Sequence, residues 1–349
     1  MQDNSYFSKK VSFLNAFLTC LIVVLHAKTP ERWGLDLNWD YPFIYCCTIL
    51  CRMGVPLFFF LSALLFYKTC TFYDLEKKLK RRIHSLVIPY LVWNAIFVGI
   101  FFLLIHVPFL NNLMHVDDGL NSFKEIFYAI VNARYTVLWF VKDLMIFLLF
   151  APIILMLTTK RQMIIAIIAS LALFFVLDFG YESIWRWLPI YLQGAYVGKF
   201  MFNKETGSYT SFEEISPAIK DNRLLLSVVF GVIVIALYAL TLWNEELFMN
   251  PYVIISPILV WLLMDLVLKQ FILNKFRIRK WMSYTFIIYC THQFILNVLQ
   301  KFVVLTCEPT ALVLNLTYII SPFVAITIAV LIGRFLSQFK FYPLLSGGR

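Results

Sequence analysis

The stretch Val11-Ser-Phe-Leu-Asn-Ala-Phe-Leu-Thr-Cys-Leu-Ile-Val-Val-Leu-His26 is an apolar run of membrane-helix character, and it ends in a histidine. An ionisable side chain in hydrocarbon costs on the order of 3 kcal/mol by insertion scales, so a histidine at this place indicates a function. Asn15 lies eleven residues earlier, which is about three helical turns. Both polar side chains therefore share one helix face, about 16 Å apart, and this face is expected to look into a protein interior or a water-filled cavity.

The composition excludes a soluble globular protein. Hydrophobic residues make up 61% of the chain and charged residues 14%, and the mean hydropathy is +0.79, beyond what soluble domains reach. The 35 Phe, 18 Tyr and 9 Trp residues suit lipid-facing surfaces and interfacial belts. The net charge of +10 does not indicate a nucleic-acid partner, because the basic residues fall between apolar runs rather than on one domain.

Apolar stretches that can span a bilayer recur along the whole chain, and they predict an all-α integral membrane protein of about ten transmembrane helices in one domain, residues 1–349. The expected spans are residues 11–27, 42–67, 84–107, 137–157, 162–179, 184–202, 224–243, 251–271, 281–305 and 311–336.

The distribution of positive charge predicts the orientation. If the amino terminus is cytoplasmic, 22 of the 30 Lys and Arg residues lie on the inner side, as the positive-inside rule requires. Both termini are then cytoplasmic, and His26 lies near the outer end of the first helix. The longest outer connection, about residues 108–134, carries His115, Asp117, Asp118 and Gly119 and is long enough for a lid or a short interfacial helix.

Two ionisable residues within the first two expected spans are candidates for a catalytic role. A neutral His26 at the outer edge can act as a general base towards a hydroxyl; a buried histidine satisfied by a neighbouring carbonyl is the alternative. Arg52 precedes the run Met53-Gly-Val-Pro-Leu-Phe-Phe-Phe-Leu-Ser62. A guanidinium inside a span needs a partner or an anionic ligand, and the alternatives are a structural ion pair or snorkelling to the outer surface.

Further candidates lie in three later segments. Lys142 and Asp143 follow Trp139 at the outer end of the fourth span, where each is expected either to hold helices together or to take part in the site. His292 lies in the middle of the ninth span. The basic run Lys77-Lys-Leu-Lys-Arg-Arg82 is a topology anchor by default, and it is also well placed to hold the phosphates of a cytoplasmic ligand. The seven cysteines show no metal-ligand spacing, and no metal or bound cofactor is expected.

Taken together, these segments resemble the acyltransferase-3 family of multi-pass membrane O-acyltransferases, over about residues 10–340. The segments occur in the family's order: His26, Arg52 with Val55-Pro-Leu-Phe-Phe-Phe-Leu-Ser62, the basic cluster before Ile88-Pro-Tyr90, Leu138-Trp-Phe140, Gly194-Ala-Tyr-Val-Gly198 and Ile288-Tyr-Cys-Thr-His292. Two departures stand out. Family members usually carry Arg or Lys where this chain has Asn15, and of two arginines three apart at the start of helix three, Arg82 matches the first while Ser85 stands at the second.

The resemblance implies transfer of an acyl group, usually acetyl, from cytoplasmic acyl-CoA to a hydroxyl of an extracytoplasmic glycan or lipid-linked sugar. It marks His26 as the essential histidine, acting as base or as transient acyl carrier. In this interpretation Arg52 stabilises developing charge, Arg81 and Arg82 hold the donor, and Asn15, Trp139, Lys142 and His292 contact substrate. A bacterial cytoplasmic membrane is the expected location. A transporter or flippase for a glycan precursor or an organic acid is the alternative function, which inverted repeats would favour.

Overall fold

The computed structural model describes residues 2–107, 120, 122–132, 135–177, 183–203 and 206–348, with side chains from residue 5 onward. Within these ranges the chain is helical, apart from an isolated β-bridge between Phe202 and Tyr209. The α-helices are α1 (Gln2–Leu25), α2 (Pro42–Cys51), α3 (Gly54–Tyr67), α4 (Leu75–Arg82), α5 (Ile88–His106), α7 (Phe123–Val131), α8 (Trp139–Leu149), α9 (Ala151–Met156), α10 (Lys160–Leu177), α11 (Leu188–Phe200), α12 (Pro217–Asp221), α13 (Arg223–Trp243), α14 (Glu245–Leu263), α15 (Lys269–Asn274), α16 (Thr285–Thr306), α17 (Ala311–Leu336) and α18 (Tyr342–Ser346).

The described residues include eight helical segments that are long and apolar enough to cross a membrane. Two of the expected spans are instead built from shorter pieces. The stretch 137–157 breaks into α8 and α9 just before Pro152, because proline cannot continue the hydrogen-bond ladder. The stretch 184–202 consists of a 3-10 turn, Ile184–Trp187, followed by α11. The all-helical membrane class is confirmed, and the count of ten stays a prediction.

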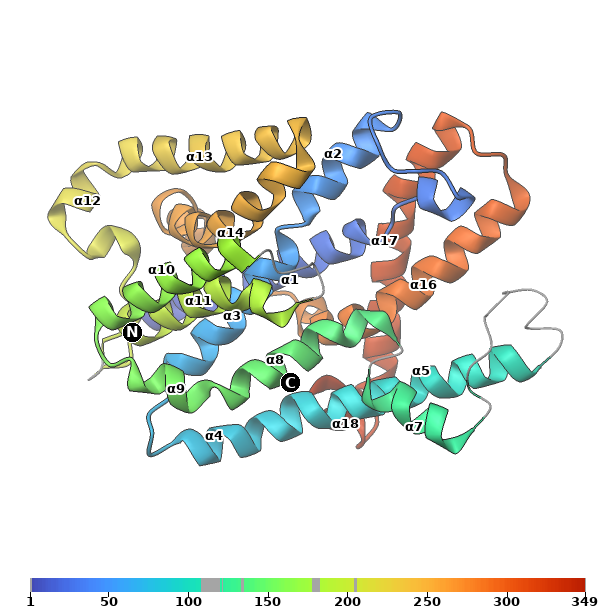
Figure 1. The fold of residues 1–349 in the computed structure, drawn as a ribbon, viewed down its shortest axis with the longest axis horizontal. Coiled ribbons are helices and arrows are strands. Elements are labelled where there is room, and N and C mark those ends of the chain that lie inside the picture. The colour runs from blue at the N-terminus through green and yellow to red at the C-terminus, as the bar shows by residue number, and fades with distance from the viewer. Residues whose placement is uncertain are drawn as a thin grey trace.

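Two π-helical turns extend spans beyond their expected limits. The turn Ile83–Val87 joins the basic α4 to α5 in one continuous segment, which Figure 1 shows along the lower edge of the molecule. The turn Met264–Leu268 joins α14 to α15 in the same way. A π-helical turn holds one residue more than an α-helical turn, so it rotates the side chains that follow around the helix axis. Such turns often occur at functional sites.

Helix α1 lies inside the bundle and contacts α2, α3, α15, α16 and α17. The backbones of α3 and α11 also approach each other closely. A Cβ atom on Gly194 would stand 2.1 Å from the carbonyl oxygen of Phe60, and one on Gly198 would stand 2.6 Å from that of Leu64. The Gly194-Ala-Tyr-Val-Gly198 motif therefore lets two backbones touch, as small residues do between membrane helices.

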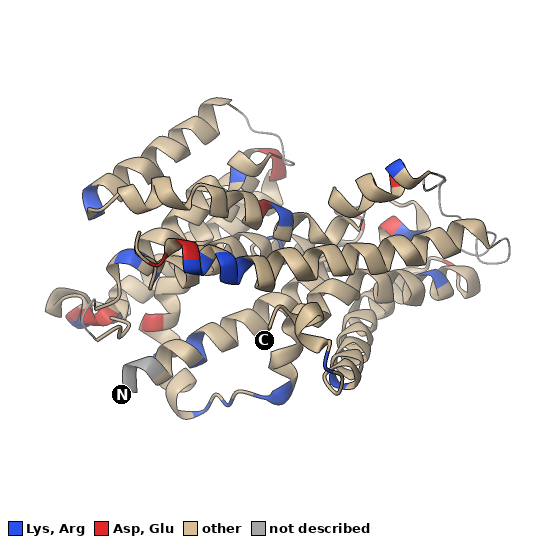
Figure 2. Ribbon diagram, turned by 90° about the horizontal axis from the view of Figure 1, so that it is seen from below, with Lys and Arg blue, Asp and Glu red and all other residues tan. Residues whose placement is uncertain are grey.

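The helix ends sort into two groups in space. In Figure 1 the amino terminus, the start of α4 and α12 lie towards the left, while the end of α5 and the α16–α17 connection lie towards the right. The charge rule assigns the first group to the inner side and the second to the outer side. Most of each long helix between them carries neither sign of charge, as Figure 2 shows.

A buried ion pair joins the amino-terminal part of α1 to the second π-helical turn. The ammonium of Lys10 lies 2.7 Å from a carboxylate oxygen of Asp265, and neither side chain is exposed. The Tyr6 and Tyr209 hydroxyls each donate to this carboxylate at 2.7 Å. Burial, reinforced by the carboxylate, raises the pKa of Tyr209 well above its ordinary range, so this hydroxyl stays a donor. The sequence analysis did not identify this cluster.

The expected outer connection contains the short helix α7, whose amino end carries a capping box between Ser122 and Glu125. Its Phe123, Phe127 and Tyr128 side chains are exposed, as in a helix that lies at a membrane surface. His115, Asp117, Asp118 and Gly119 lie outside the described residues.

Candidate active site

Two histidines from opposite ends of the chain meet between α1 and α16. The ring centroids of His26 and His292 are 5.2 Å apart, with the ring planes at 48°. His292 is fully buried, whereas His26 is half-buried. The described structure shows no hydrogen bond to the His26 ring, so the alternative of a histidine satisfied by a neighbouring carbonyl is not observed there.

The orientation of His292 follows from its backbone contacts. Its Nδ1 lies 2.8 Å from the carbonyl oxygen of Tyr289 and 3.1 Å from that of Ile288. Because carbonyls only accept, Nδ1 carries the proton, and a neutral ring keeps its lone pair on Nε2. Nε2 is buried and makes no hydrogen bond among the described residues. The ring therefore presents an unused acceptor.

A cavity of about 310 Å³ lies among α1, α3, α8 and α16. Asn15 and Thr19 of α1 line it, together with Thr285 and Tyr289 of α16. These residues share helical faces with the histidines, since they precede His26 or His292 by three, seven or eleven positions. The Tyr289 ring lies 6.2 Å from the His292 ring, and its hydroxyl donates to the Val137 carbonyl. Tyr289 thus connects the wall of the cavity to His292, although neither histidine lines the cavity itself.

Arg82 is the charged residue among the described residues that line this cavity. It is the last residue of α4, and its guanidinium lies 5.7 Å from the Phe66 ring centroid. Asn15, where the family usually has a basic residue, lines the same cavity without charge. Positive charge in the cavity is therefore supplied from α4 rather than from α1.

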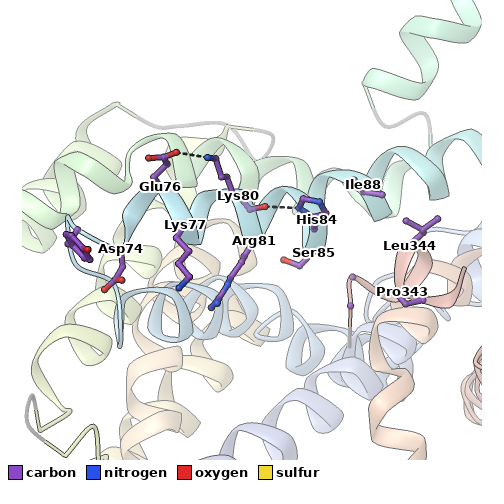
Figure 3. Close-up of a pocket in the computed structure, with 13 residues that line it drawn as sticks. Asp74, Glu76, Lys77, Lys80, Arg81, His84, Ser85, Ile88, Pro343 and Leu344 are labelled. Atoms are coloured by element: carbon purple, nitrogen blue, oxygen red, sulfur yellow. Dashed lines mark hydrogen bonds and ion pairs between the residues drawn. The ribbon is translucent and has the colours of Figure 1, made fainter. Parts of the chain in front are cut away.

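A second, larger hollow of about 860 Å³ opens on the surface between α4 and the carboxyl-terminal α18. Figure 3 shows Lys77 and Arg81 pointing the same way in it, one helical turn apart. Lys80 instead pairs with Glu76 at 2.6 Å. Lys77 and Arg81 make no ion pair within the described parts of the chain, so both are available to an anionic ligand.

The two predicted donor-binding arginines therefore face different spaces. Successive helical residues point about 100° apart, so Arg81 reaches the surface hollow while Arg82 reaches the inner cavity. Ser85 also lines the surface hollow. The backbone of Gly347 packs against it so closely that a Cβ would stand 2.5 Å from the Ser85 carbonyl oxygen. The carboxyl-terminal segment occupies the space beside this departure from the family pattern.

Arg52 lies in an ion pair rather than beside the histidines. Its guanidinium is 2.5 Å from a carboxylate oxygen of Glu245 at the start of α14, and both side chains are about one-third exposed or less. The Tyr45 hydroxyl donates to the same carboxylate at 3.2 Å. The structural ion pair that the sequence analysis left open is thus the arrangement in the structure.

In the fourth expected span, Trp139 was predicted to contact substrate but does not line the inner cavity. Trp139 packs in an aromatic cluster, with its ring centroid 6.2 Å from Phe59 and 5.8 Å from Trp187. Its neighbour Phe140 lines the inner cavity instead. Lys142 makes no ion pair among the described residues, and Asp143 is buried.

Sequence reasoning missed Thr19, Thr285 and Tyr289. The signal was present, because polar residues at 285, 289 and 292 recur at helical spacing within an apolar run. Among the described residues no group of three or more His, Cys, Asp or Glu is placed to hold a metal ion.

Comparison with known proteins identifies the family of this chain. The family described as an acyltransferase domain, acyltransferase-3, matches residues 10–334. Succinoglycan biosynthesis protein ExoH of Rhizobium meliloti (strain 1021) is 24% identical over 176 residues. This match covers 46% of the present chain and 46% of that protein, so it spans about half the length of either. No solved structure matches.

Proposed function

The chain belongs to the acyltransferase-3 family of multi-pass membrane O-acyltransferases, and on this premise we propose that it moves an acetyl group from cytoplasmic acyl-CoA to a hydroxyl of an extracytoplasmic glycan or lipid-linked sugar. The family match covers nearly all of the chain, and the relative in R. meliloti is named for succinoglycan biosynthesis. The assignment favours group transfer over the alternative of a transporter.

One observation carries the proposal: the His26–His292 pair forms where α1 meets α16, and residues of the same two helices line the cavity that contains Arg82. The surface hollow with Lys77 and Arg81 suits the phosphates of CoA, because charge-assisted contacts to phosphate are strong. The neutral polar residues of the cavity suit the amide groups of the pantetheine arm. A donor held in this way brings its thioester towards the histidines from the inner side.

His26 is the proposed base. It takes the proton of the acceptor hydroxyl while the hydroxyl oxygen attacks the thioester carbonyl carbon. The carbon–sulfur bond then breaks, and the CoA thiolate leaves and is protonated. In the alternative route the acyl group passes first to a nitrogen of His26 and then to the acceptor, which predicts ping-pong kinetics. In both routes His292, anchored by two carbonyls, contacts the reacting groups through Nε2.

We propose that Arg52 holds the start of α14 against α2 through Glu245, rather than stabilising the developing charge. Trp139 supports the wall of the cavity through Phe59, and Lys142 remains a candidate for acceptor contact. The proposed setting is a bacterial cytoplasmic membrane with ten spans and both termini inside. The distribution of Lys and Arg along the chain supports this orientation.

Transfer is tested directly with sealed membrane vesicles that contain the overproduced chain. Labelled acetyl-CoA is supplied on the cytoplasmic side and glycans on the other side are analysed by mass spectrometry. The proposal expects acetyl groups on hydroxyls of the glycan, and their absence in vesicles carrying His26→Ala. Equal acetylation in vesicles without the chain contradicts it.

A further inference from the structure

Besides Arg82, a second cationic side chain, that of Arg32, lies near the histidine pair, on the expected outer side. Arg32 belongs to the 3-10 turn Pro30–Trp33, which follows α1 directly. The turn is fixed to the bundle because the Thr29 hydroxyl donates to the Leu314 carbonyl at 2.9 Å. Arg32 follows His26 by only six residues, and the Gln300 side chain contacts both Arg32 and the Ala27 carbonyl. Arg32 therefore lies in the neighbourhood of His26 without being its nearest partner.

A fully buried glutamine holds the Arg32 side chain in place. The Gln300 amide nitrogen donates to the Ala27 carbonyl at 2.9 Å and to the Ser321 hydroxyl at 3.4 Å. These contacts direct the Gln300 side-chain oxygen away from Ala27 and Ser321, and this oxygen accepts a hydrogen bond from Arg32 Nε at 2.8 Å. Gln300 thus links the guanidinium to the backbone residue that follows His26.

The charge of Arg32 has no carboxylate partner among the described ion pairs. The adjacent acid, Glu31, accepts from Lys28 at 2.9 Å. With Nε occupied by a neutral amide, the two terminal nitrogens of the half-buried guanidinium make no hydrogen bond within the described residues. A guanidinium cannot lose its charge, and its paired N–H groups match the two oxygens of a carboxylate or phosphate.

We propose that Arg32 is a specificity-determining residue that binds an anionic oxygen group of the acceptor, next to the hydroxyl that receives the acyl group. This inference rests on the proposed function, and it narrows the acceptor class to glycans that bear a carboxylate or a phosphate. The expected outer position of Arg32 suits the acceptor rather than the donor, and Arg32 lines neither the inner cavity nor the surface hollow. Gln300 acts as a positioning residue for the guanidinium.

Binding is measured on the purified full-length chain in lipid nanodiscs, without acyl-CoA, by saturation-transfer NMR titration. The probes are a glucuronosyl-glucose disaccharide, the neutral disaccharide cellobiose, and glucose 1-phosphate. We expect an anionic probe to bind the wild type about tenfold or more tightly than cellobiose, because a hydrogen bond to a charged group is worth this much. The stronger anionic probe identifies the carboxylate or the phosphate as the source.

Three variants assign the preference to the guanidinium. Arg32→Gln should abolish it and Arg32→Lys should restore part of it. Gln300→Glu should abolish it as well, because the new carboxylate pairs with Arg32. The matched control is Lys301→Gln, which removes the same charge from a side chain that takes no part in the described hydrogen bonds or ion pairs. In transfer assays Arg32→Gln should raise the acceptor KM and leave the acyl-CoA KM unchanged.

The inference is overturned if the wild type binds cellobiose as tightly as both anionic probes. It is equally overturned if Arg32→Gln keeps the preference or if Lys301→Gln loses it. Because binding is measured without a donor, an Arg32-dependent preference in a chain that transfers no acyl group would refute the proposed function and leave the anion site standing.

Discussion

His26, directly after α1, and His292 of α16 lie with ring centroids 5.2 Å apart, and the unprotonated Nε2 of His292 is buried in the bundle. The backbone carbonyls on Nδ1 fix this tautomer, so the pair is oriented before any substrate arrives. Nε2 of His292 makes no hydrogen bond among the described residues, so it stays available to a group that binds beside the pair.

The first prediction concerns this pair. His26→Ala should reduce kcat by about 10²–10⁴-fold, the range for a lost general base, while the protein still accumulates in the membrane. His292→Gln should also reduce kcat, and the double variant should be little worse than His26→Ala alone, because residues that act as a unit are not additive. His106→Ala, at an exposed end of α5, serves as the control. Near-normal transfer by well-expressed His26→Ala would refute the assignment.

The second prediction separates the donor contacts. Neutralising Lys77 and Arg81 together should raise the KM for acyl-CoA at least tenfold with little change in kcat, because both face the surface hollow. Arg82→Gln should affect kcat as well, since Arg82 lines the same cavity as Tyr289, whose ring lies beside His292. Lys80→Gln is the matched control, because Lys80 is already paired with Glu76. An unchanged donor KM in the Lys77/Arg81 variant would make these residues topology anchors.

The third prediction concerns Arg52. If its ion pair with Glu245 is structural, Arg52→Gln and Glu245→Gln should lower thermal stability by similar amounts and leave kcat of the folded enzyme within a few-fold of wild type. Exchanging the two charges, Arg52→Glu with Glu245→Arg, should restore part of the stability. A large loss of kcat in Arg52→Gln alone, with Glu245→Gln active, would return Arg52 to the catalytic group.

The fourth prediction concerns the buried pair of Lys10 and Asp265. Asp265→Ala should destabilise the protein strongly, by about 3–5 kcal/mol, because it leaves a buried ammonium without its partner. The double variant Lys10→Met/Asp265→Leu should be less destabilised than Asp265→Ala, since it removes both charges. The midpoint of thermal unfolding in detergent measures this order. The exposed pair of Glu76 and Lys80 provides a control in which no change is expected.

The fifth prediction concerns orientation. Cys307 is exposed in the expected outer connection between α16 and α17. As the single cysteine in an otherwise cysteine-free chain, it should react with a membrane-impermeant maleimide added outside intact cells. A cysteine at Tyr73, which is 96% exposed in the α3–α4 connection, should react only after permeabilisation. Position 118, outside the described residues, should behave like Cys307, and the reverse pattern would invert the topology.

Sequence by itself determined the class of this protein and most of its helices. Hydropathy and basic residues are local properties, so the apolar runs and the α4 charges could be read without knowing any contact. The family segments marked His26 and His292 separately. The breaks between α8 and α9 and before α11 were harder to predict, because two short apolar helices give the same hydropathy profile as one long transmembrane helix.

The contacts between residues that are distant in the sequence depend on how the helices pack in the tertiary structure. Lipid chains are as apolar as leucine side chains, so hydrophobicity does not choose helix partners inside a membrane; close packing and polar contacts choose them. The approach of Gly194 to Phe60 and the pairing of Arg52 with Glu245 depend on that choice. The same choice brings His26 to His292, two residues whose separation along the chain gives no local signal of contact.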